Sequence, residues 1–365
     1  MAITYVRPND HHHLQNIANL LGAASKIVTV TGAGISTNAG IPDFRSRNGV
    51  HSSGYRHLFH WSVLFDTDRR PLFYKRIADM RRAAERANPT KTHRFIRDLC
   101  DSGKLVRNYT QNIDGLEGKV GLLTDVRKGP GSRSSFHRRS RLKRNHRVGH
   151  ERRRQDDSRG VECVLLHGSL HRLRCSNCPG TFGWNEGSRE MESLPDREPS
   201  CPGCTKISED RKAEGKRATA VGKLRPDIVL YDEQDPRAEW ISAIARHDQS
   251  LRPDALLIMG TSLATHGVQL LIRDFAKVIH ERPAGKVVFV NLTEPAKSWD
   301  SVIDYWVKWD CDAWVTDLVK RQPALLCGNN GSLIPKILID LTEEDGQLEH
   351  KSPGSSRENP IDLTL

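Results

Sequence analysis

The chain has 365 residues, of which 37% are hydrophobic, so it can bury one sizeable core and a smaller module besides tails. It contains no apolar run of about 18 residues and no apolar signal-peptide stretch at its N-terminus, so we expect a soluble, intracellular protein without a membrane partner. The net charge is +11, but the segment from Arg133 to Arg154 contributes +9, with ten Lys or Arg against one acid. The rest of the chain is therefore nearly neutral, and a basic nucleic-acid groove across the fold is not indicated.

Apolar runs alternate with helix-like patterns along the chain, as a parallel sheet with crossover helices requires. Six runs are predicted strands: residues 27–31, 105–110, 164–167, 228–231, 255–259 and 287–291. Most are continuously apolar, which is typical of strands buried on both faces. Residues 50–100 predict a helix-rich excursion between the first two strands. The predicted fold class is therefore α/β, a Rossmann-like parallel sheet with helices on both faces plus a smaller domain.

A glycine-rich loop, T-G-A-G-I-S-T-N-A-G-I-P-D-F-R-S, follows the first predicted strand. Its Gly32 and Gly34 would let backbone amides approach a pyrophosphate at the start of a helix. Alone the motif is weak, because Thr37 stands at the usual third glycine, and an ordinary glycine turn is an equal alternative. The continuation strengthens it, since Asp43, Phe44 and Arg45 place a carboxylate, an aromatic face and a guanidinium beside the loop.

Two further polar motifs stand where predicted strands end. Asn112 and Asp114, in T-Q-N-I-D-G-L, come just past the carboxyl end of a strand, where ligand-contacting loops belong. His167 ends another strand in L-H-G-S-L. Without context such a histidine is more often a satisfied core residue, but a reference pKa of about 6.5 suits a general base near neutral pH.

The basic segment from Arg133 to Arg154 has few apolar residues and predicts a solvated, disordered loop. Three interpretations stay open: a patch that contacts DNA phosphate or a nuclear importin, a plain surface loop, or a gene-model artefact such as a retained intron.

Eight cysteines in a chain of this length fit a metal site in a reducing compartment better than a disulfide framework. Two C-x-x-C pairs predict a zinc ribbon with the ligands Cys175, Cys178, Cys201 and Cys204. Four thiolates leave no position for water, so the zinc should be structural, and its loss should unfold the module. The alternative is four unrelated thiols; Cys100, Cys163 and Cys327 are interpreted as core or incidental thiols.

Taken together, these motifs resemble the sirtuins, the NAD-consuming protein lysine deacylases, in the family's order. Further matching pieces are L-R-P-D-I-V-L-Y-D-E at 224–233, G-T-S-L at 260–263 and V-N-L-T at 290–293. The resemblance runs from about Leu14 to about Val319. It implies a catalytic domain at 14–320 between tails at 1–13 and 321–365. Within it we expect Rossmann-like parts at 14–49, 101–127, 161–170 and 222–320, a helical lid insertion at 50–100, a basic insertion at 128–160 and a zinc-binding module at 171–221.

The resemblance also implies residue roles. In sirtuin chemistry the acetyl-lysine amide oxygen attacks the nicotinamide ribose of NAD and nicotinamide leaves, with His167 as general base. Asn112 and Asp114 would position the ribose, the nicotinamide amide and a water, with Ile113 against the ring and Gln111 on the ribose. The remaining NAD contacts implied are Gly32, Ala33, Gly34, Ser36, Asp43, Phe44, Arg45, Gly260, Thr261, Ser262, Asn291 and Cys311. Gly260 as a plain turn and Cys311 as a buried thiol remain alternatives.

Substrate contacts are implied at Ile228, Val229, Leu230 and Tyr231, whose backbone would pair with an extended peptide. Asp232 departs from the family, which often has Gly there, so the local turn stays open. The stretches 162–175 and 224–233 look most like the fungal nuclear branch that deacetylates core histones. That likeness implies an acetylated histone substrate, O-acetyl-ADP-ribose and nicotinamide as products, a role in chromatin silencing or genome maintenance, and a nuclear location, with the cytoplasm as alternative.

The C-terminal tail contains Ile-Asp-Leu-Thr twice, within I-L-I-D-L-T-E-E-D at 337–345 and within P-I-D-L-T-L at 360–365. Such short β-prone cores resemble SUMO-interacting motifs, which add a strand to a partner's sheet edge. A C-terminal strand or a disordered tail is the alternative. For the whole chain, the other functions considered are a deacylase of longer acyl chains, a mono-ADP-ribosyltransferase, and a catalytically impaired chromatin scaffold whose basic insertion displaces the strand that carries His167.

Overall fold

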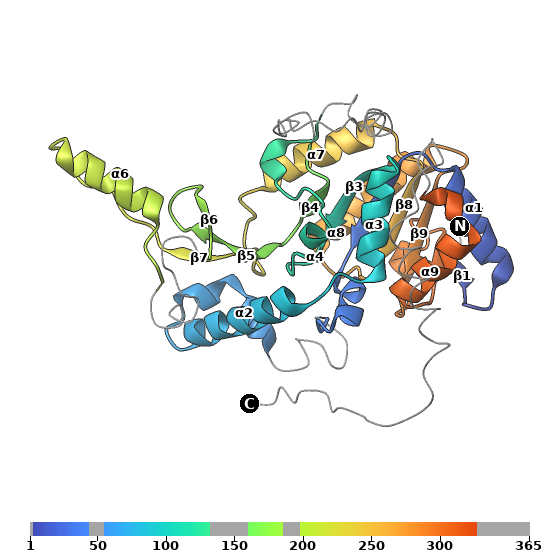
Figure 1. The fold of residues 1–365 in the computed structure, drawn as a ribbon, viewed down its shortest axis with the longest axis horizontal. Helices are drawn as coiled ribbons and strands as arrows, with labels where there is room; N and C mark the ends of the chain where they lie inside the picture. The colour runs from blue at the N-terminus through green and yellow to red at the C-terminus, as the bar shows by residue number, and fades with distance from the viewer. Residues whose placement is uncertain (1–2, 44–54, 132–159, 185–197, 327–365) are drawn as a thin grey trace, which may run out of the picture.

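The computed structural model describes residues 3–43, 55–131, 160–184 and 198–326. Phe44, Arg45, most of the basic insertion and the SUMO-like tail motifs lie outside these ranges. Within them, no helix combines the length and apolar character needed to cross a bilayer. The described part forms a large α/β domain and a smaller domain beside it (Figure 1).

The large domain is built on a seven-stranded sheet in which every neighbouring pair is parallel. Its strands in spatial order are β1 (Thr4–Val6), β10 (Tyr305–Val307), β9 (Lys286–Val290), β8 (Ala255–Met259), β2 (Ile27–Thr31), β3 (Leu105–Thr110) and β4 (Cys163–Leu165). The central strands β2, β3 and β8 are buried along their whole length. In β3 this burial includes Arg107, which is paired with the buried Asp248. The α/β fold class predicted from the sequence is confirmed.

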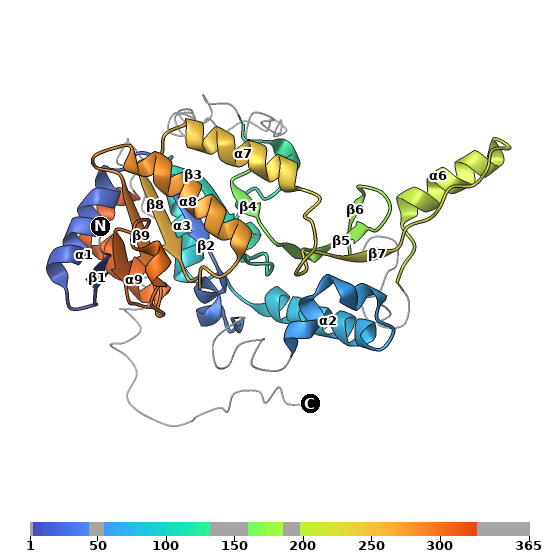
Figure 2. The same ribbon diagram turned by 180° about the vertical axis from the view of Figure 1, so that it is seen from behind.

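Helices cover both faces of this sheet. One face carries α1 (His11–Ala23), α3 (Lys91–Asp101) and α9 (Cys311–Arg321), and the other carries α7 (Ala238–Ser250) and α8 (His266–His280), as Figures 1 and 2 show from opposite sides. Alternate residues of one strand enter different cores: Leu257 packs with α1, α3 and α9, whereas Leu256 and Ile258 pack with α7 and α8. The period of two along each strand therefore divides the apolar side chains between the layers.

The smaller domain joins two parts of the chain that are far apart in sequence. Its elements are η3 (Tyr55–Phe59), η4 (Trp61–Phe65), α2 (Arg69–Arg86), β5 (Gly168–Cys175), β6 (Thr181–Gly183), α6 (Pro202–Ala213) and β7 (Leu224–Ile228). The strands form an antiparallel sheet in the order β6-β5-β7. Phe73 and Ile77 of α2 share one apolar cluster with Leu173 of β5 and Leu224 of β7. The helical insertion and the zinc module are therefore one folded unit.

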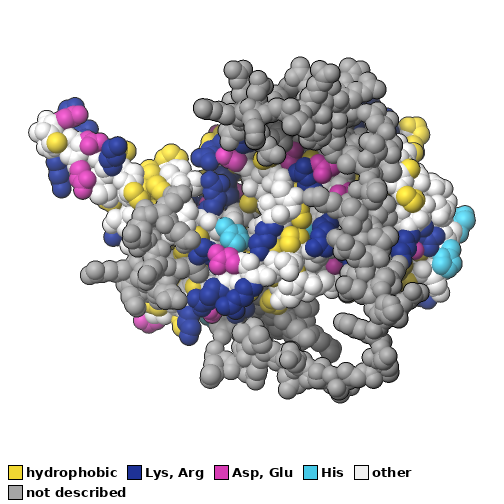
Figure 3. All heavy atoms as spheres, viewed as in Figure 1, with side chains coloured by type: hydrophobic (Ala, Val, Ile, Leu, Met, Phe, Trp, Pro, Cys, Tyr) yellow, Lys and Arg dark blue, Asp and Glu magenta, His cyan; other side chains and the backbone are white. Residues whose placement is uncertain are grey.

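Three elements differ from the sequence analysis. Residues 4–6, assigned to a tail, form edge strand β1, with Val6 buried against β10. The strand predicted at 228–231 as part of the parallel sheet is absent from that sheet. The strand observed here, β7, ends at Ile228 and pairs with β5 in the antiparallel sheet of the smaller domain. The zinc module also contains a helix that the sequence analysis did not predict. This helix, α6, begins directly after Cys201 and projects from the body, with side chains of both charges exposed (Figures 1 and 3).

The remaining short elements are α4 (Leu116–Lys119), η1 (Ala33–Ile35), η2 (Thr37–Ala39), η5 (Val126–Lys128), η8 (Lys297–Trp299) and η9 (Pro323–Leu325).

The two ends of the basic insertion meet. The Val161 N–H donates to the Gly129 carbonyl (3.0 Å), and a Cβ on Gly160 would collide with Pro130 and Gly131. The buried Arg107 also donates to the Pro130 carbonyl (3.1 Å). Strand β4 follows at once and pairs in register with β3. The idea that the insertion displaces the strand before His167 is therefore wrong.

We expect deletion of residues 132–159, with Gly131 joined to Gly160 by a glycine pair, to leave the thermal midpoint of unfolding within a few degrees of the intact chain. Closing a shorter loop costs less chain entropy, by about 0.6 kcal/mol for each halving of its length. Differential scanning calorimetry of both proteins checks this. A midpoint lower by about 10 °C would mean that the insertion packs on the fold.

Candidate active site and metal centre

The order of the parallel strands creates a crevice at the carboxyl end of β2. From β2 the chain continues to β3 and β4 on one side, whereas β8, β9 and β10 lie on the other. Open α/β sheets bind ligands at such a switch point. The loops after these strands carry Gly32, Gln111, His167, Gly260 and Asn291, so the fold brings the predicted cofactor residues to one edge of the sheet.

The glycines of the first loop allow a close approach between two loops. The Gly32 and Gly34 amides donate to the carbonyls of Met259 (3.1 Å) and Gly260 (2.8 Å). A Cβ on Gly34 would lie 2.7 Å from the Gly260 Cα, and Gly260 itself has φ +63°. The loop then forms the short η1 and η2 in place of a long helix. These two amides are thus occupied within the protein, so the amides that would approach a pyrophosphate here are others of the loop.

Replacing Gly34 by alanine should force these backbones apart and lower the stability by about 1–3 kcal/mol, as overpacking does. Gly267, inside α8 with open space around it, is the matched control. Alanine at Gly267 should stabilise the helix by roughly 0.5–1 kcal/mol. Urea unfolding of both variants measures the difference; equal effects at the two positions would contradict the packing argument.

A buried polar network holds the second loop. Ser36 Oγ donates to Asp114 Oδ2 (2.8 Å), Asn112 Nδ2 donates to Ser36 Oγ (3.1 Å), and the Leu116 N–H donates to Asp114 Oδ1 (3.0 Å). Asn112 Oδ1 is buried and has no hydrogen-bond partner within the described ranges. A buried acceptor without a partner costs free energy, so this oxygen suits a donor group of a ligand. Ile113 beside it is also buried.

His167 is fixed in one tautomer. Its Nδ1 lies 3.0 Å from the Gln111 carbonyl oxygen, which can only accept, so Nδ1 carries the proton and Nε2 presents a lone pair. Burial lowers the pKa of His167 below its usual value, although the Gln111 carbonyl partly opposes this. The imidazole is therefore neutral near pH 7 and can accept a proton at Nε2.

Residues on the far side of the crevice are held by short polar contacts. Gln111 Nε2 donates to Thr261 Oγ1 (2.8 Å), joining the loops after β3 and β8. Asn291 donates through Nδ2 to the Thr293 carbonyl (3.2 Å). Cys311 is buried at the first position of α9, and burial raises the pKa of its thiol. Ala33 and Asp43 are half-buried in the first loop, and Ser262 is exposed.

The segment predicted to pair with substrate already uses several backbone groups. The Val229 amide donates to the His167 carbonyl (2.9 Å), and the Tyr231 amide donates to the Phe59 carbonyl (2.8 Å). The Leu230 amide donates to the Glu233 carboxylate (3.0 Å). Ile228 is the last residue of β7 and pairs with Gly168. The Leu230 and Tyr231 carbonyls also accept, from the Glu233 amide (3.1 Å) and the Trp61 amide (3.1 Å), so an extended peptide at these two residues would displace a present bond.

Asp232, which stands where the family often has Gly, occupies a left-handed turn. Its φ is +63°, and its carboxylate lies 3.0 Å from His60 Nε2. Asp tolerates this region better than most residues because its side chain can bond locally. The turn that the sequence left open thus has a glycine-like backbone with an added contact. The following Glu233 is held by Arg174 and Arg225.

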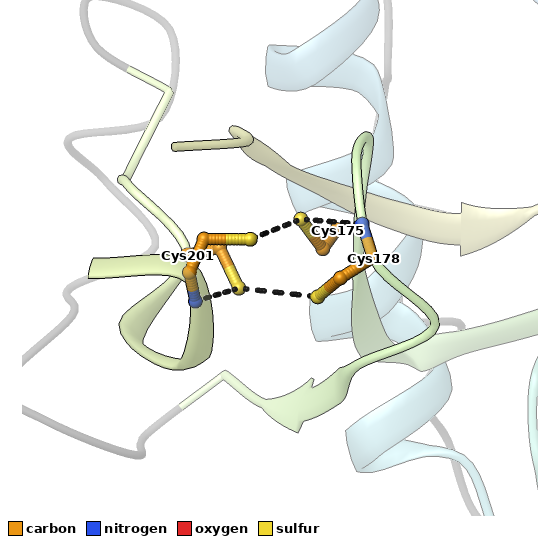
Figure 4. A group of neighbouring side chains, drawn as sticks. Cys175, Cys178 and Cys201 are labelled. Carbon is orange, nitrogen blue, oxygen red and sulfur yellow. Dashed lines mark hydrogen bonds between the residues drawn. The ribbon is translucent and has the colours of Figure 1, made fainter. Parts of the chain in front are cut away.

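The four predicted metal ligands converge. Sγ atoms of Cys175 and Cys204 lie 3.7 Å apart, as do those of Cys178 and Cys201, and all four lie within 4.8 Å of one another. Tetrahedral zinc with bonds of about 2.3 Å requires sulfur separations of about 3.8 Å. Figure 4 shows the side chains of Cys175, Cys178 and Cys201 pointing toward one another. These separations exclude disulfides, and backbone amides of Asn177 and Gly180 donate to the sulfurs, as in zinc knuckles.

Sequence reasoning gave no role to His93 and Glu117. Both are fully buried, and with Asp114 they form a second cluster of ionisable groups. The only sequence signal is that Glu117 follows Asp114 by three residues, a spacing that is common by chance.

The parallel sheet, the crevice at its switch point and the four-cysteine module define a dinucleotide-binding α/β protein with a structural metal site. The Sir2 family model matches residues 32–164 and 155–267, and the chain belongs to the Sir2 family. The resemblance predicted from the sequence is thus confirmed.

Similar proteins include the NAD-dependent histone deacetylases HST3 of Saccharomyces cerevisiae and of Candida albicans. The first is 38% identical over 332 residues, covering 86% of this chain and 69% of that protein. The second is 36% identical over 327 residues, covering 86% of this chain and 63% of that protein. The crystal structure of a Sir2 homolog–NAD complex matches with a TM-score of 0.59 at 20% identity, over 89% of this chain and 98% of that one, so the fold is shared.

Proposed function

We propose that this protein is an NAD-dependent protein lysine deacetylase that acts on acetylated histones and releases nicotinamide and O-acetyl-ADP-ribose. The observation that carries the proposal is the state of His167: a neutral imidazole whose Nδ1–H is bound to the Gln111 carbonyl, so that Nε2 is a base beside the cofactor loop. Membership of the Sir2 family and the HST3 relatives support the same activity.

The residues of the crevice have separate tasks in this reaction. NAD, when bound, supplies the ribose that takes the acetyl group and the nicotinamide that leaves. His167 accepts a proton at Nε2 from a ribose hydroxyl, which makes that oxygen a better nucleophile. Asn112 Oδ1 accepts a hydrogen bond from the ligand, and Ser36 together with Asp114 fixes the Asn112 side chain. Gln111 orders the wall between the loops after β3 and β8.

The zinc module supports the site from outside the crevice. Structural zinc held by the four cysteines fixes the end of β5, whose first residue Gly168 follows His167 directly. Residues 228–231 lie beside His167, through the Val229 amide, and are proposed to receive the peptide that carries the acetyl-lysine.

The proposal is tested with NAD and a histone peptide acetylated on lysine, measuring nicotinamide and deacetylated peptide together. Equal amounts of the two products are expected. Nicotinamide without deacetylated peptide, accompanied by labelled ADP-ribose on protein, would favour the mono-ADP-ribosyltransferase. A preference for longer acyl peptides would favour the broader deacylase, and silence with all peptides would favour a scaffold.

A histone substrate places the proposed site of action in the nucleus. Residues 128–160 are proposed to contact DNA or an importin, and the tail to bind SUMO-modified proteins. Both proposals rest on the sequence alone, because these segments lie mostly outside the residues that the structure describes. Loss of nuclear accumulation on deleting residues 132–159 would support the first proposal. Unchanged amide shifts of a tail peptide on adding SUMO would rule out the second.

A further inference from the structure

Three ionisable side chains form a buried cluster directly behind the Asn112–Asp114 loop. His93 comes from α3, Asp114 from the loop after β3, and Glu117 from α4. One ligand-type atom of each lies within 4.8 Å of the others. His93 and Glu117 are completely buried. The arrangement matters because Asp114 also accepts from Ser36, which holds Asn112 in the crevice.

Thr90 lies on the Nδ1 side of His93. Its amide nitrogen is 3.3 Å from Nδ1 and its hydroxyl oxygen is 2.9 Å from Nδ1, and that hydroxyl also donates to the Ile35 carbonyl (2.9 Å). Burial lowers the pKa of His93 to about 4, which makes the ring neutral at pH 7. Nε2 has no hydrogen-bond partner among the described residues, and the charged groups near the ring are Asp114, Asp312 and Arg94.

Among the residues that the structure describes, no cation balances a negative charge on Glu117. The titratable groups that face it are His93 from α3, Asp114 from its own loop and the Cys163 thiol from β4, with the Thr110 hydroxyl at the end of β3. Among the described residues no donor reaches either carboxyl oxygen in hydrogen-bond geometry, whereas an Asp114 carboxylate oxygen lies within 4.8 Å. Burial first, and the Asp114 charge second, raise the pKa of Glu117 to about 8. At pH 7 the carboxyl group is therefore protonated and is a donor.

Resting on the proposed function, which gives Asp114 to the NAD site, we propose that Glu117 is a positioning residue: a neutral carboxylic acid that donates a hydrogen bond to the Asp114 carboxylate and thereby keeps Asp114 turned toward Ser36 and Asn112. A second negative charge in this space would repel Asp114 and disturb Ser36. The residue acts through Asp114 and does not touch the substrate.

The test compares the intact protein with Glu117→Gln, which keeps the shape and a neutral donor, and with Glu117→Ala, which removes the donor. Deacetylation kcat/KM is measured between pH 6 and 10. The intact protein should lose activity above pH 8 as Glu117 ionises. The glutamine variant should keep activity at pH 7 within about threefold and lack that loss, whereas the alanine variant should be weaker by about tenfold or more.

A second readout needs no catalysis and so separates this proposal from the proposed function. Because the folded pKa lies above the ordinary value of 4.5, stability contributed by the neutral acid is present below pH 4.5 and is lost as pH rises through about 8. The thermal midpoint of Glu117→Gln should therefore exceed that of the intact protein by a margin that grows between these pH values.

Glu162→Gln is the matched control, because Glu162 is also buried but lies 3.5 Å from Arg97 and accepts from the Leu123 amide. Its midpoint should fall at pH 7, opposite in sign to the Glu117 variant. The proposal is overturned if Glu117→Gln keeps the alkaline loss at an unchanged pH, if its thermal gain does not grow with pH, or if the purified protein holds a second metal ion that Glu117→Gln loses.

Discussion

Replacing His167 by alanine should lower deacetylase turnover by about 10²- to 10⁴-fold, the usual contribution of a general base, while the protein stays folded. The side chain is only half-buried and makes one hydrogen bond within the described structure, to the Gln111 carbonyl, so its removal leaves no large cavity or unpaired charge. Turnover of an acetylated histone peptide and the thermal midpoint measure the two parts of this expectation. His12→Ala, at an exposed position of α1, is the control.

The pH profile gives an independent check on the same residue. His167 must be neutral to accept a proton, so activity is present above its pKa and lost as pH falls through it. Since burial lowers that pKa below 6.5, the midpoint of the acidic loss should lie below pH 6.5. An acidic midpoint well above that value, or substantial turnover in the alanine variant, would remove His167 from the proposed role.

Loss of the metal should have the largest effect on stability. Isolated peptides with structural zinc gain roughly 10–16 kcal/mol from the metal, more than most domains possess in total. Cys175, Cys201 and Cys204 are part of the apolar cluster that also contains α2 and β7, so Cys201→Ser should unfold the smaller domain as a whole. Zinc content by mass spectrometry and urea unfolding measure this.

Cys100→Ala, at a buried thiol of α3 outside the cluster, is the matched control and should keep its zinc. The expectation fails if the native protein purifies without zinc, or if Cys201→Ser unfolds at the same urea concentration as the intact chain.

The strands that sequence reasoning placed correctly share one physical property. β2 and β8 are buried on both faces because helices cover both sides of the sheet, so they stand out in the sequence without an alignment; β8 is wholly apolar, and β2 adds only Thr29 and Thr31. β7 gives no such signal: Arg225 and Asp227 are charged, yet both are buried because Glu233 and Arg237 pair with them. These partners follow eight and ten residues further along the chain, beyond the end of β7, and only the fold brings them back to the strand. β1 has three residues, too few for a period.

The same division holds for the site. The four cysteines follow from spacing alone, since a zinc ribbon needs short pairs separated by a loop. Asn112 and His167 follow from their places at strand ends. The close contact of Gly34 with Gly260 could not be predicted, because the partner loop lies more than two hundred residues away in the printed sequence. The protonated state of Glu117 depends on burial and on Asp114, and no spacing encodes either.

The meeting of Gly129 and Val161 also has a practical consequence. A chain that leaves and re-enters the fold at one point offers a graft site: an affinity tag, a fluorescent protein or a chemical handle placed between residues 131 and 160 would hang from the edge strand of the sheet, with its two ends already at the spacing of a hairpin. Because the chain ends at 131 and 160 already meet, the length of the segment between them can change without altering the pairing of β4 with β3.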